Sequence, residues 1–142
     1  PFKADNLHDT AALRKKSPLP LIADENSIIA ANIPDIAHAF DGINIKLMKC
    51  ASLLEGKRMI DTARNYDLQI MLGCMVESAV GITAAAHLAP QVDYADLDGN
   101  LLIDNDPYNG VKVKNGRLIL PDGNGLGVVL DSSYEKNWTE LK

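Results

Sequence analysis

The sequence has few cysteines, few aromatic residues and no long hydrophobic run. Its two cysteines, Cys50 and Cys74, are not in a CxxC pair and cannot form a disulfide framework. We expect both to be reduced, buried thiols in a cytoplasmic protein. No apolar stretch reaches the roughly 20 residues that cross a bilayer, so we expect no membrane span. These absences exclude a disulfide-rich secreted scaffold and an integral membrane protein.

Excess positive charge is also absent. The chain has 14 Lys and Arg residues against 19 Asp and Glu residues, and its formal net charge is −5. The longest basic run is Arg14-Lys15-Lys16, which is too short for the basic stripe of a nucleic-acid-binding surface. We therefore expect neither nucleic acid nor a membrane surface as a partner.

The 142 residues, 46% of them hydrophobic, are enough for one globular domain with a core. The first residues have no signal-peptide architecture. The chain begins with Pro1 rather than Met. We expect it to be a processed chain or a piece of a longer polypeptide.

The remaining pattern alternates helices with strands. Helices are predicted at 6–16, 29–40, 52–66 and 78–88, and strands at 19–23, 42–47, 69–73 and 93–97. A hairpin is predicted at 111–120, with Asn115-Gly116 as its turn. Repeated strand–helix units imply parallel strands joined by right-handed crossovers. Periodicity alone leaves two α/β folds open: an open doubly wound sheet and half of a (β/α) barrel.

Polar residues at the strand ends favour the barrel. In the second predicted strand, alternation places Asn44 and Lys46 on the same face. In the fourth, Asp96 and Asp98 share a face, and Asp24 follows the first strand. Strands buried in an open parallel sheet would be apolar on both faces. Barrel enzymes, by contrast, carry their catalytic groups at the carboxyl ends of the strands. Lys46 facing a barrel lumen would be desolvated, which lowers its pKa and suits a base.

Four segments resemble successive strand-end motifs of the muconate-lactonizing subgroup of the enolase superfamily. They are IADEN (22–26), INIKLMK (43–49), MLGCMVESAVGITAAAHLA (71–89) and DLDG (96–99). Their order and spacing are most similar to those of L-Ala-D/L-Glu epimerases and related dipeptide epimerases.

The resemblance implies the C-terminal half of a (β/α)7β barrel, a modified TIM barrel. Parallel strands five to eight would lie in residues 1–109. Residues 110–130 would form the terminal β-hairpin and a segment returning toward the capping domain, and residues 131–142 a polar tail.

The resemblance also implies roles for five residues. Asp24 corresponds to the third carboxylate ligand of the catalytic Mg²⁺, and Lys46 to the acid/base lysine of the sixth strand. Asp96 and Asp98 correspond to the pair that binds the substrate's α-ammonium group in dipeptide epimerases. Glu77 matches an acidic position after the seventh strand, where we expect a supporting role behind the residues that touch the ligand.

The implied reaction is Mg²⁺-dependent epimerisation of a dipeptide by 1,1-proton transfer through an enediolate. The superfamily uses a Lys or His base with Mg²⁺, which stabilises the developing charge. Oxygen ligands suit Mg²⁺, and carboxylates suit a cationic amino terminus. An alternative is another reaction of the subgroup, such as cycloisomerisation or dehydration. Asp96 and Asp98 argue against it, because those substrates lack an α-ammonium group.

Other parts of the family's active site have no counterpart in this sequence. The second-strand lysine, the first two metal carboxylates and the capping domain are missing, and Ala51-Ser52 replaces the usual Gly-Gly. We therefore expect an incomplete site that needs the N-terminal half of the same enzyme or a homodimer partner. The alternative is an isolated, inactive half-barrel or a self-assembling unit.

For the other residues that could take part in chemistry, we expect structural roles. We expect Lys49 to be solvated or to start a helix, because its parity in the strand is opposite to that of Lys46. The three histidines, His8, His38 and His87, are not spaced as a metal site. The glycine-rich segment 123–127 lacks the Lys-Ser/Thr of a P-loop.

Overall fold

The computed structural model describes residues 2–134. The chain divides into two compact units: unit 1 comprises Pro1–Gly73 and Leu88–Asp96, and unit 2 comprises Cys74–His87 and Leu97–Lys142. The predicted tail beyond residue 134, with Trp138, lies outside the described residues. No helix within residues 2–134 is long and apolar enough to cross a membrane.

Unit 1 is built on a four-stranded parallel sheet in the order β1-β2-β3-β4. The strands are β1 (Ile22–Ala23), β2 (Gly42–Ile45), β3 (Gln69–Leu72) and β4 (Tyr94–Ala95). The strands lie in sequence order, and each parallel pair is joined by a crossover connection. The predicted parallel α/β sheet is therefore confirmed. Each strand is shorter than predicted. β1 begins after Pro20, which has no N–H for the sheet.

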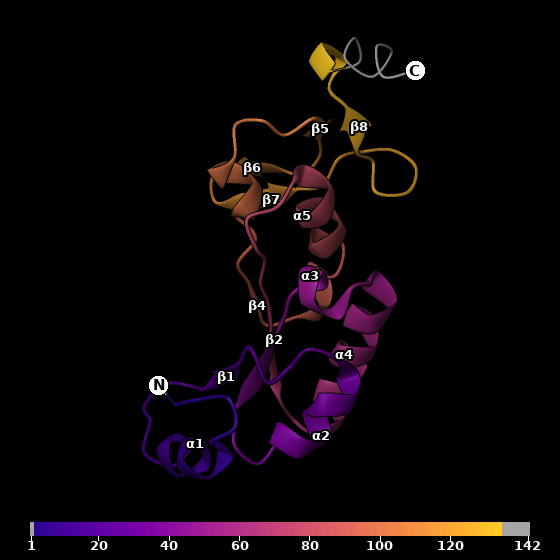
Figure 1. Ribbon diagram of the computed structural model, residues 1–142. Helices are drawn as coiled ribbons and strands as arrows, with labels where there is room; N and C mark the ends of the chain where they lie inside the picture. The colour runs from indigo at the N-terminus through magenta and orange to yellow at the C-terminus, as the bar shows by residue number, and fades with distance from the viewer. Residues whose placement is uncertain (1, 135–142) are drawn as a thin grey trace. The chain divides into compact units, whose positions relative to one another are not determined.

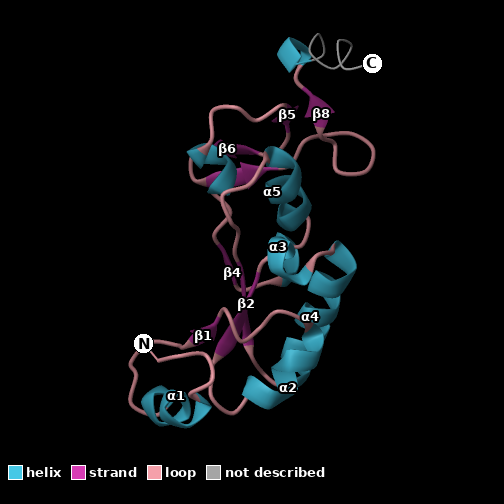
Figure 2. Ribbon diagram, viewed as in Figure 1, coloured by secondary structure: helices cyan, strands magenta, loops and turns pink. Residues whose placement is uncertain are grey.

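Helices connect the strands of unit 1 (Figures 1 and 2). They are η1 (Ala30–Asn32), α2 (Ile33–Ile36), α3 (Leu47–Cys50), α4 (Leu53–Asn65) and η2 (Ala89–Gln91), while α1 (Leu7–Arg14) precedes β1. The helix predicted at 29–40 is thus wrong in length. The Asn32 side chain accepts hydrogen bonds from the N–H groups of Ile28 and Ile29. This segment therefore forms η1 and the short α2 instead of one long helix. Pro34 lies in the first turn of α2, where its missing N–H costs little.

Helix α4 packs on β2 and β3 through one face. Its buried residues recur at helical spacing: Gly56, Met59, Ile60 and Ala63. The Ser52 hydroxyl accepts the Glu55 N–H, as expected of an N-cap. The Glu55 carboxylate accepts a hydrogen bond from the Ala30 N–H, so it ties η1 to α4.

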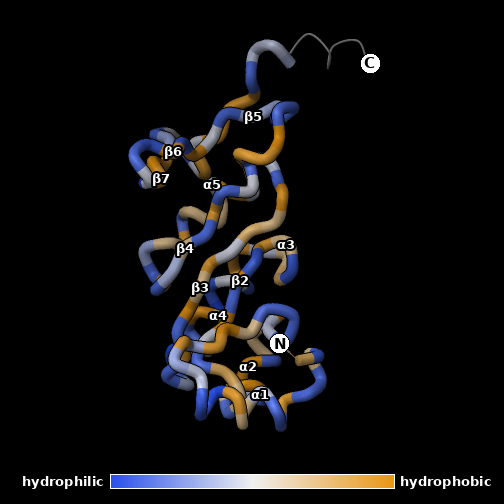
Figure 3. The backbone as a smooth tube through the Cα atoms, turned by 90° about the vertical axis from the view of Figure 1, so that its left-hand side faces the viewer, coloured by the Kyte–Doolittle hydropathy of each residue, from blue (hydrophilic) through white to orange (hydrophobic). Residues whose placement is uncertain are grey.

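The core of unit 1 lies between the sheet and these helices. Ile43, Ile45, Ile70 and Leu72 are fully buried, and each contributes roughly 1.5–3 kcal/mol. Figure 3 shows orange, hydrophobic stretches along this part of the chain. A Cβ at Gly42 would lie 2.5 Å from the Gln69 backbone oxygen, so the close approach of β2 to β3 requires glycine.

Unit 2 combines a helix with two small antiparallel sheets. Its elements are α5 (Ala79–Ala86), η3 (Gly99–Leu102), β5 (Tyr108–Asn109), β6 (Lys112–Lys114), β7 (Arg117–Ile119) and β8 (Val129–Leu130). The predicted hairpin is confirmed as β6–β7. Asn115 and Gly116 have φ values of 52° and 72°, which a two-residue hairpin turn requires. The sequence did not predict that β5 would pair with β8.

Candidate active site

The carboxyl ends of β1 and β2 bring polar side chains together in unit 1. Ala23 is paired with Ile43, so Asp24 leaves β1 opposite Asn44. Lys46 follows β2 directly and precedes α3. Because the two strands are parallel neighbours, their ends meet at one edge of the sheet, as the sequence predicted.

The Asp24 carboxylate contacts two lysines. Lys46 Nζ lies 2.9 Å from Oδ2 of Asp24. Lys49 Nζ contacts Oδ1 and also donates to the Asp24 backbone oxygen at 2.6 Å. The exposed fractions are 30% for the Asp24 side chain, 17% for Lys46 and 15% for Lys49, so all three are largely shielded from water. One carboxylate therefore meets two ammonium groups.

These contacts determine the protonation state of Asp24. Partial burial by itself raises the pKa of the carboxyl. Hydrogen bonds and attraction from Lys49 and Lys46 outweigh burial and hold the pKa below its ordinary value of 3.8. Asp24 is thus an anion at neutral pH.

The position of Lys49 corrects the sequence interpretation. Lys49 lies in the short helix α3, which agrees with one of the two predicted alternatives. The other alternative, a solvated side chain, is wrong. The prediction continued the strand through Leu47, whereas α3 begins there. In a helix, residues three apart lie on neighbouring positions of the surface, which brings Lys49 to the same carboxylate as Lys46.

Asn44 is the residue that sequence reasoning placed on this face but gave no role. It is 7% exposed, and its amide Nδ2 donates to Oδ2 of Asp24 at 3.3 Å. Its Oδ1 is buried and accepts no hydrogen bond within the described part of the chain. A buried polar atom of this kind is uncommon and marks a place where a further donor would be stabilised.

The other predicted site residues lie elsewhere in the chain. β4 ends at Ala95, so Asp96 and Asp98 follow the strand rather than sharing its face, and both are exposed. Asp96 belongs to unit 1, where its N–H donates to the Leu72 oxygen at 2.9 Å.

Asp98 and Glu77 belong to unit 2. Asp98 Oδ1 lies 3.9 Å from the sulfur of Cys74. Glu77 accepts the Met75 N–H at 3.1 Å, which fixes the loop that precedes α5. The supporting role expected for Glu77 in the site stays a prediction.

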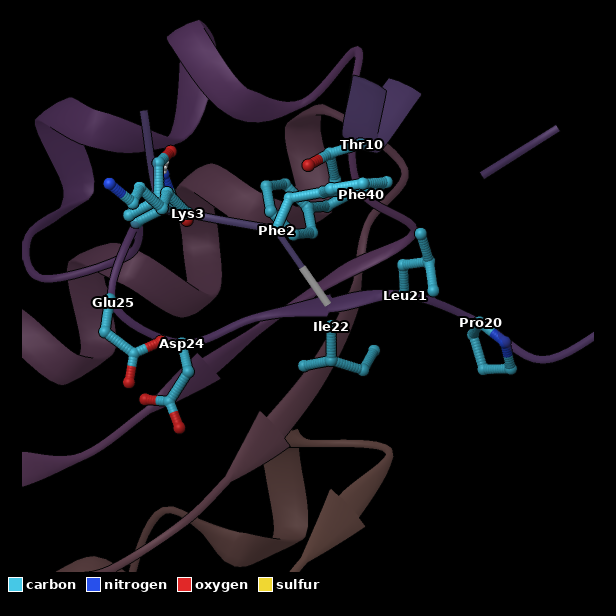
Figure 4. Close-up of a pocket in the computed structure, with 11 residues that line it drawn as sticks. Phe2, Lys3, Thr10, Pro20, Leu21, Ile22, Asp24, Glu25 and Phe40 are labelled. Carbon is cyan, nitrogen blue, oxygen red and sulfur yellow. Dashed lines mark hydrogen bonds between the residues drawn. The ribbon is translucent and has the colours of Figure 1, made fainter. Parts of the chain in front are cut away.

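A cavity of about 390 Å³ lies beside β1 and includes Asp24 in its lining. Phe2 and Phe40 lie together in one part of it, and Asp24 and Glu25 lie side by side in another (Figure 4). Among the described residues, β1 pairs only with β2, so its other edge has no strand partner there.

The residues around Asp24 fit one ligand of a hard metal ion and no more. The Asp24 carboxylate is an oxygen ligand of the type that Mg²⁺ takes. However, no group of three or more His, Cys, Asp or Glu side chains in residues 2–134 is arranged to hold a metal ion. Within residues 2–134, the site therefore offers Asp24 as a single carboxylate ligand.

Cys50 is buried, as predicted, whereas the predicted burial of Cys74 is wrong, because this residue is partly exposed.

Comparisons with known proteins identify the family of the chain. Residues 1–134 match the family model described as "Enolase C-terminal domain-like". The chain therefore belongs to the enolase C-terminal domain-like family.

Curated relatives of the chain are dipeptide epimerases. An L-Ala-D/L-amino acid epimerase of Flavobacterium johnsoniae is 48% identical over 130 residues, which are 92% of this chain and 39% of the relative. An L-Ala-D/L-Glu epimerase of Bacteroides thetaiotaomicron is 44% identical over 129 residues, 91% of this chain and 34% of the relative. The chain thus spans less than half the length of these relatives.

Solved structures give the same result. A dipeptide epimerase of Methylococcus capsulatus, complexed with Mg and the dipeptide L-Arg-D-Lys, matches with a TM-score of 0.84 and 35% identity over 91% of this chain and 38% of that one. A substrate-liganded L-Ala-D/L-Glu epimerase of Bacillus subtilis matches with a TM-score of 0.84 and 28% identity, again over 91% and 38%.

Proposed function

We propose that this chain is the C-terminal half of the catalytic barrel of a dipeptide epimerase. The observation that carries the proposal is the contact between Asp24 and Lys46 at the ends of adjacent parallel strands. By the resemblance, the counterpart of Asp24 binds the metal and the counterpart of Lys46 transfers the proton. The similarity to dipeptide epimerases over more than nine-tenths of the chain supports the reaction class.

The half-barrel is supported by the sheet of unit 1. Its four parallel strands follow the sequence order, as consecutive strands of a (β/α) barrel do. β1 and β4 are its edge strands among the described residues, and a closed barrel removes such edges. The missing strands would come from the N-terminal half of the same enzyme or from a second copy of this chain.

In the assembled enzyme, Asp24 would supply one oxygen ligand to Mg²⁺. The ion would stabilise the negative charge that develops on the substrate carboxylate. Partial burial raises the pKa of Asp24, but Lys49 and Lys46 lower it by more. The carboxylate ligand therefore stays ionised.

Lys46 is the proposed acid/base for one face of the substrate α-carbon. Its side chain is mostly buried, so water does not compete strongly for its ammonium group. In one direction the amine takes the α-proton, and in the other the ammonium returns it. The second lysine, for the opposite face, lies outside this chain.

Asp96 and Asp98 are proposed to bind the α-ammonium group of the dipeptide. Both side chains are exposed and acidic, as this task requires. Glu77 is proposed to support the site through the loop that it fixes at Met75.

The test is epimerisation followed by ¹H NMR in D₂O with a panel of L-Ala-Xaa dipeptides. The chain alone should leave the α-protons unexchanged, and the full-length polypeptide that contains it should exchange and epimerise them. Full-length protein that binds dipeptides without exchange of any α-proton would contradict the proposal.

A further inference from the structure

The amide of Asn44 is held in a fixed place beside Asp24. Nδ2 points to Oδ2 of Asp24 at 3.3 Å, and the side chain is 7% exposed. This direction of the amide is determined by the carboxylate, because exchanging nitrogen and oxygen would put two acceptors together. The oxygen Oδ1 is therefore the end without a partner in the described residues.

Gly73, at the end of β3, makes the room for this amide. A Cβ at Gly73 would lie 2.6 Å from Oδ1 and 2.9 Å from Nδ2 of Asn44, closer than real contacts allow. The backbone of Gly73 is not in the left-handed region, so conformation does not require glycine there. The Asn44 amide occupies the space that a side chain at position 73 would fill.

We propose that Asn44 is a positioning residue for Asp24: seated on Gly73, it holds the carboxylate oxygen Oδ2 in the orientation that binds Mg²⁺. The buried Oδ1, which has no partner in the described residues, would be stabilised by a further hydrogen-bond donor. This inference rests on the proposed role of Asp24 in the enzyme but names a residue to which the resemblance gives no role.

Asn44 differs from the lysines because it is uncharged. Removing Lys46 or Lys49 would change the electric field at the metal as well as the geometry. Replacing Asn44 by leucine removes the amide and leaves the net charge unchanged. A change in metal affinity then reports the loss of the amide without any change in net charge.

The experiment is calorimetric titration of Mg²⁺ into the metal-free, full-length polypeptide that contains this chain. Asn44→Leu is expected to raise the Kd for Mg²⁺ about tenfold or more, as is usual when a group behind a metal ligand is lost. Gly73→Ala is expected to change the Kd in the same direction, because it displaces the amide without removing it. Should Asn44→Leu fail to fold, Gly73→Ala decides the question.

Ile43→Val is the matched control. Ile43 is fully buried on the opposite face of β2, so the change weakens the same strand without touching Asp24. Its Kd for Mg²⁺ should stay within twofold of the wild type. A Kd within twofold of the wild type for both Asn44→Leu and Gly73→Ala would overturn the inference.

Failure of the proposed reaction is distinguishable from failure of this inference. A wild-type protein that binds no Mg²⁺ overturns the positioning role together with the metal site. A protein that binds Mg²⁺ but epimerises no dipeptide overturns only the reaction, because the Kd values of the variants still decide the role of Asn44.

Discussion

Two substitutions in the ion cluster of Asp24, Lys46 and Lys49 are predicted to destabilise the fold by different amounts. Asp24→Asn leaves two largely buried ammonium groups without their shared counterion. Lys49→Met leaves Asp24 in contact with Lys46 and Asn44. We therefore expect Asp24→Asn to destabilise the fold more than Lys49→Met does.

The magnitudes follow from burial. Breaking a buried ion pair by removing one partner costs about 3–5 kcal/mol, whereas an exposed pair contributes about 0–1 kcal/mol. Side chains that are 15% to 30% exposed lie between these limits, near the buried end. We expect Asp24→Asn to cost about 2–3 kcal/mol and Lys49→Met about 1 kcal/mol. The double variant should be about 1 kcal/mol more stable than Asp24→Asn, because it removes the surplus positive charge.

The assay is urea unfolding of the 142-residue chain in EDTA at a single protein concentration. EDTA keeps metal ions from competing for Asp24, and the fixed concentration holds any contribution from oligomerisation constant. The result that refutes the reasoning is additivity of the two substitutions within about 0.5 kcal/mol. Equal losses for the two single variants would refute it as well.

Three further predictions concern the chain itself. Partial burial raises the pKa of Asp41, but the Leu21 N–H and Arg14 lower it below 3.8. The unfolded state therefore binds more protons near that pH, so urea titrations should show stability falling below about pH 4, with a shallower fall for Asp41→Asn. Mg²⁺ should bind the isolated chain only weakly, because Asp24 is its one proposed ligand; a micromolar Kd by calorimetry would contradict this. The free edges of β1 and β4 predict a homodimer in sedimentation equilibrium at micromolar concentration, and a single 15.4 kDa monomer with cooperative unfolding would exclude it.

Features encoded by neighbouring residues were predictable from the sequence. Asn115-Gly116 predicted its hairpin turn, and Ser52 predicted the start of α4, because both depend on a few adjacent backbone groups. The meeting of Asp24 with Lys46 was predictable for a different reason. Parallel strands in sequence order end at the same edge, so residues that follow them become neighbours.

Features that depend on distant contacts or on a single boundary were not predictable. The contact of Lys49 with Asp24 was not predicted, because the end of β2 was set two residues too late and α3 begins where the strand was expected to continue. β5 and β8 are two-residue strands about 20 residues apart in sequence, too short to give an alternating pattern. The use of Gly73 as the seat of the Asn44 amide appears only when both strands are in register.

The most direct test of the proposed function is the stereochemistry of proton exchange in Lys46→Ala. The full-length polypeptide that contains this chain is incubated in D₂O with each epimer of its dipeptide, and loss of the α-proton signal is followed by ¹H NMR. The wild-type protein should exchange the α-proton of both epimers. Lys46→Ala should lose exchange of the epimer whose proton faces Lys46, retain exchange of the other, and no longer interconvert them. Exchange of both epimers at wild-type rates in Lys46→Ala would contradict the assignment of Lys46 and, with it, the proposed half of the active site.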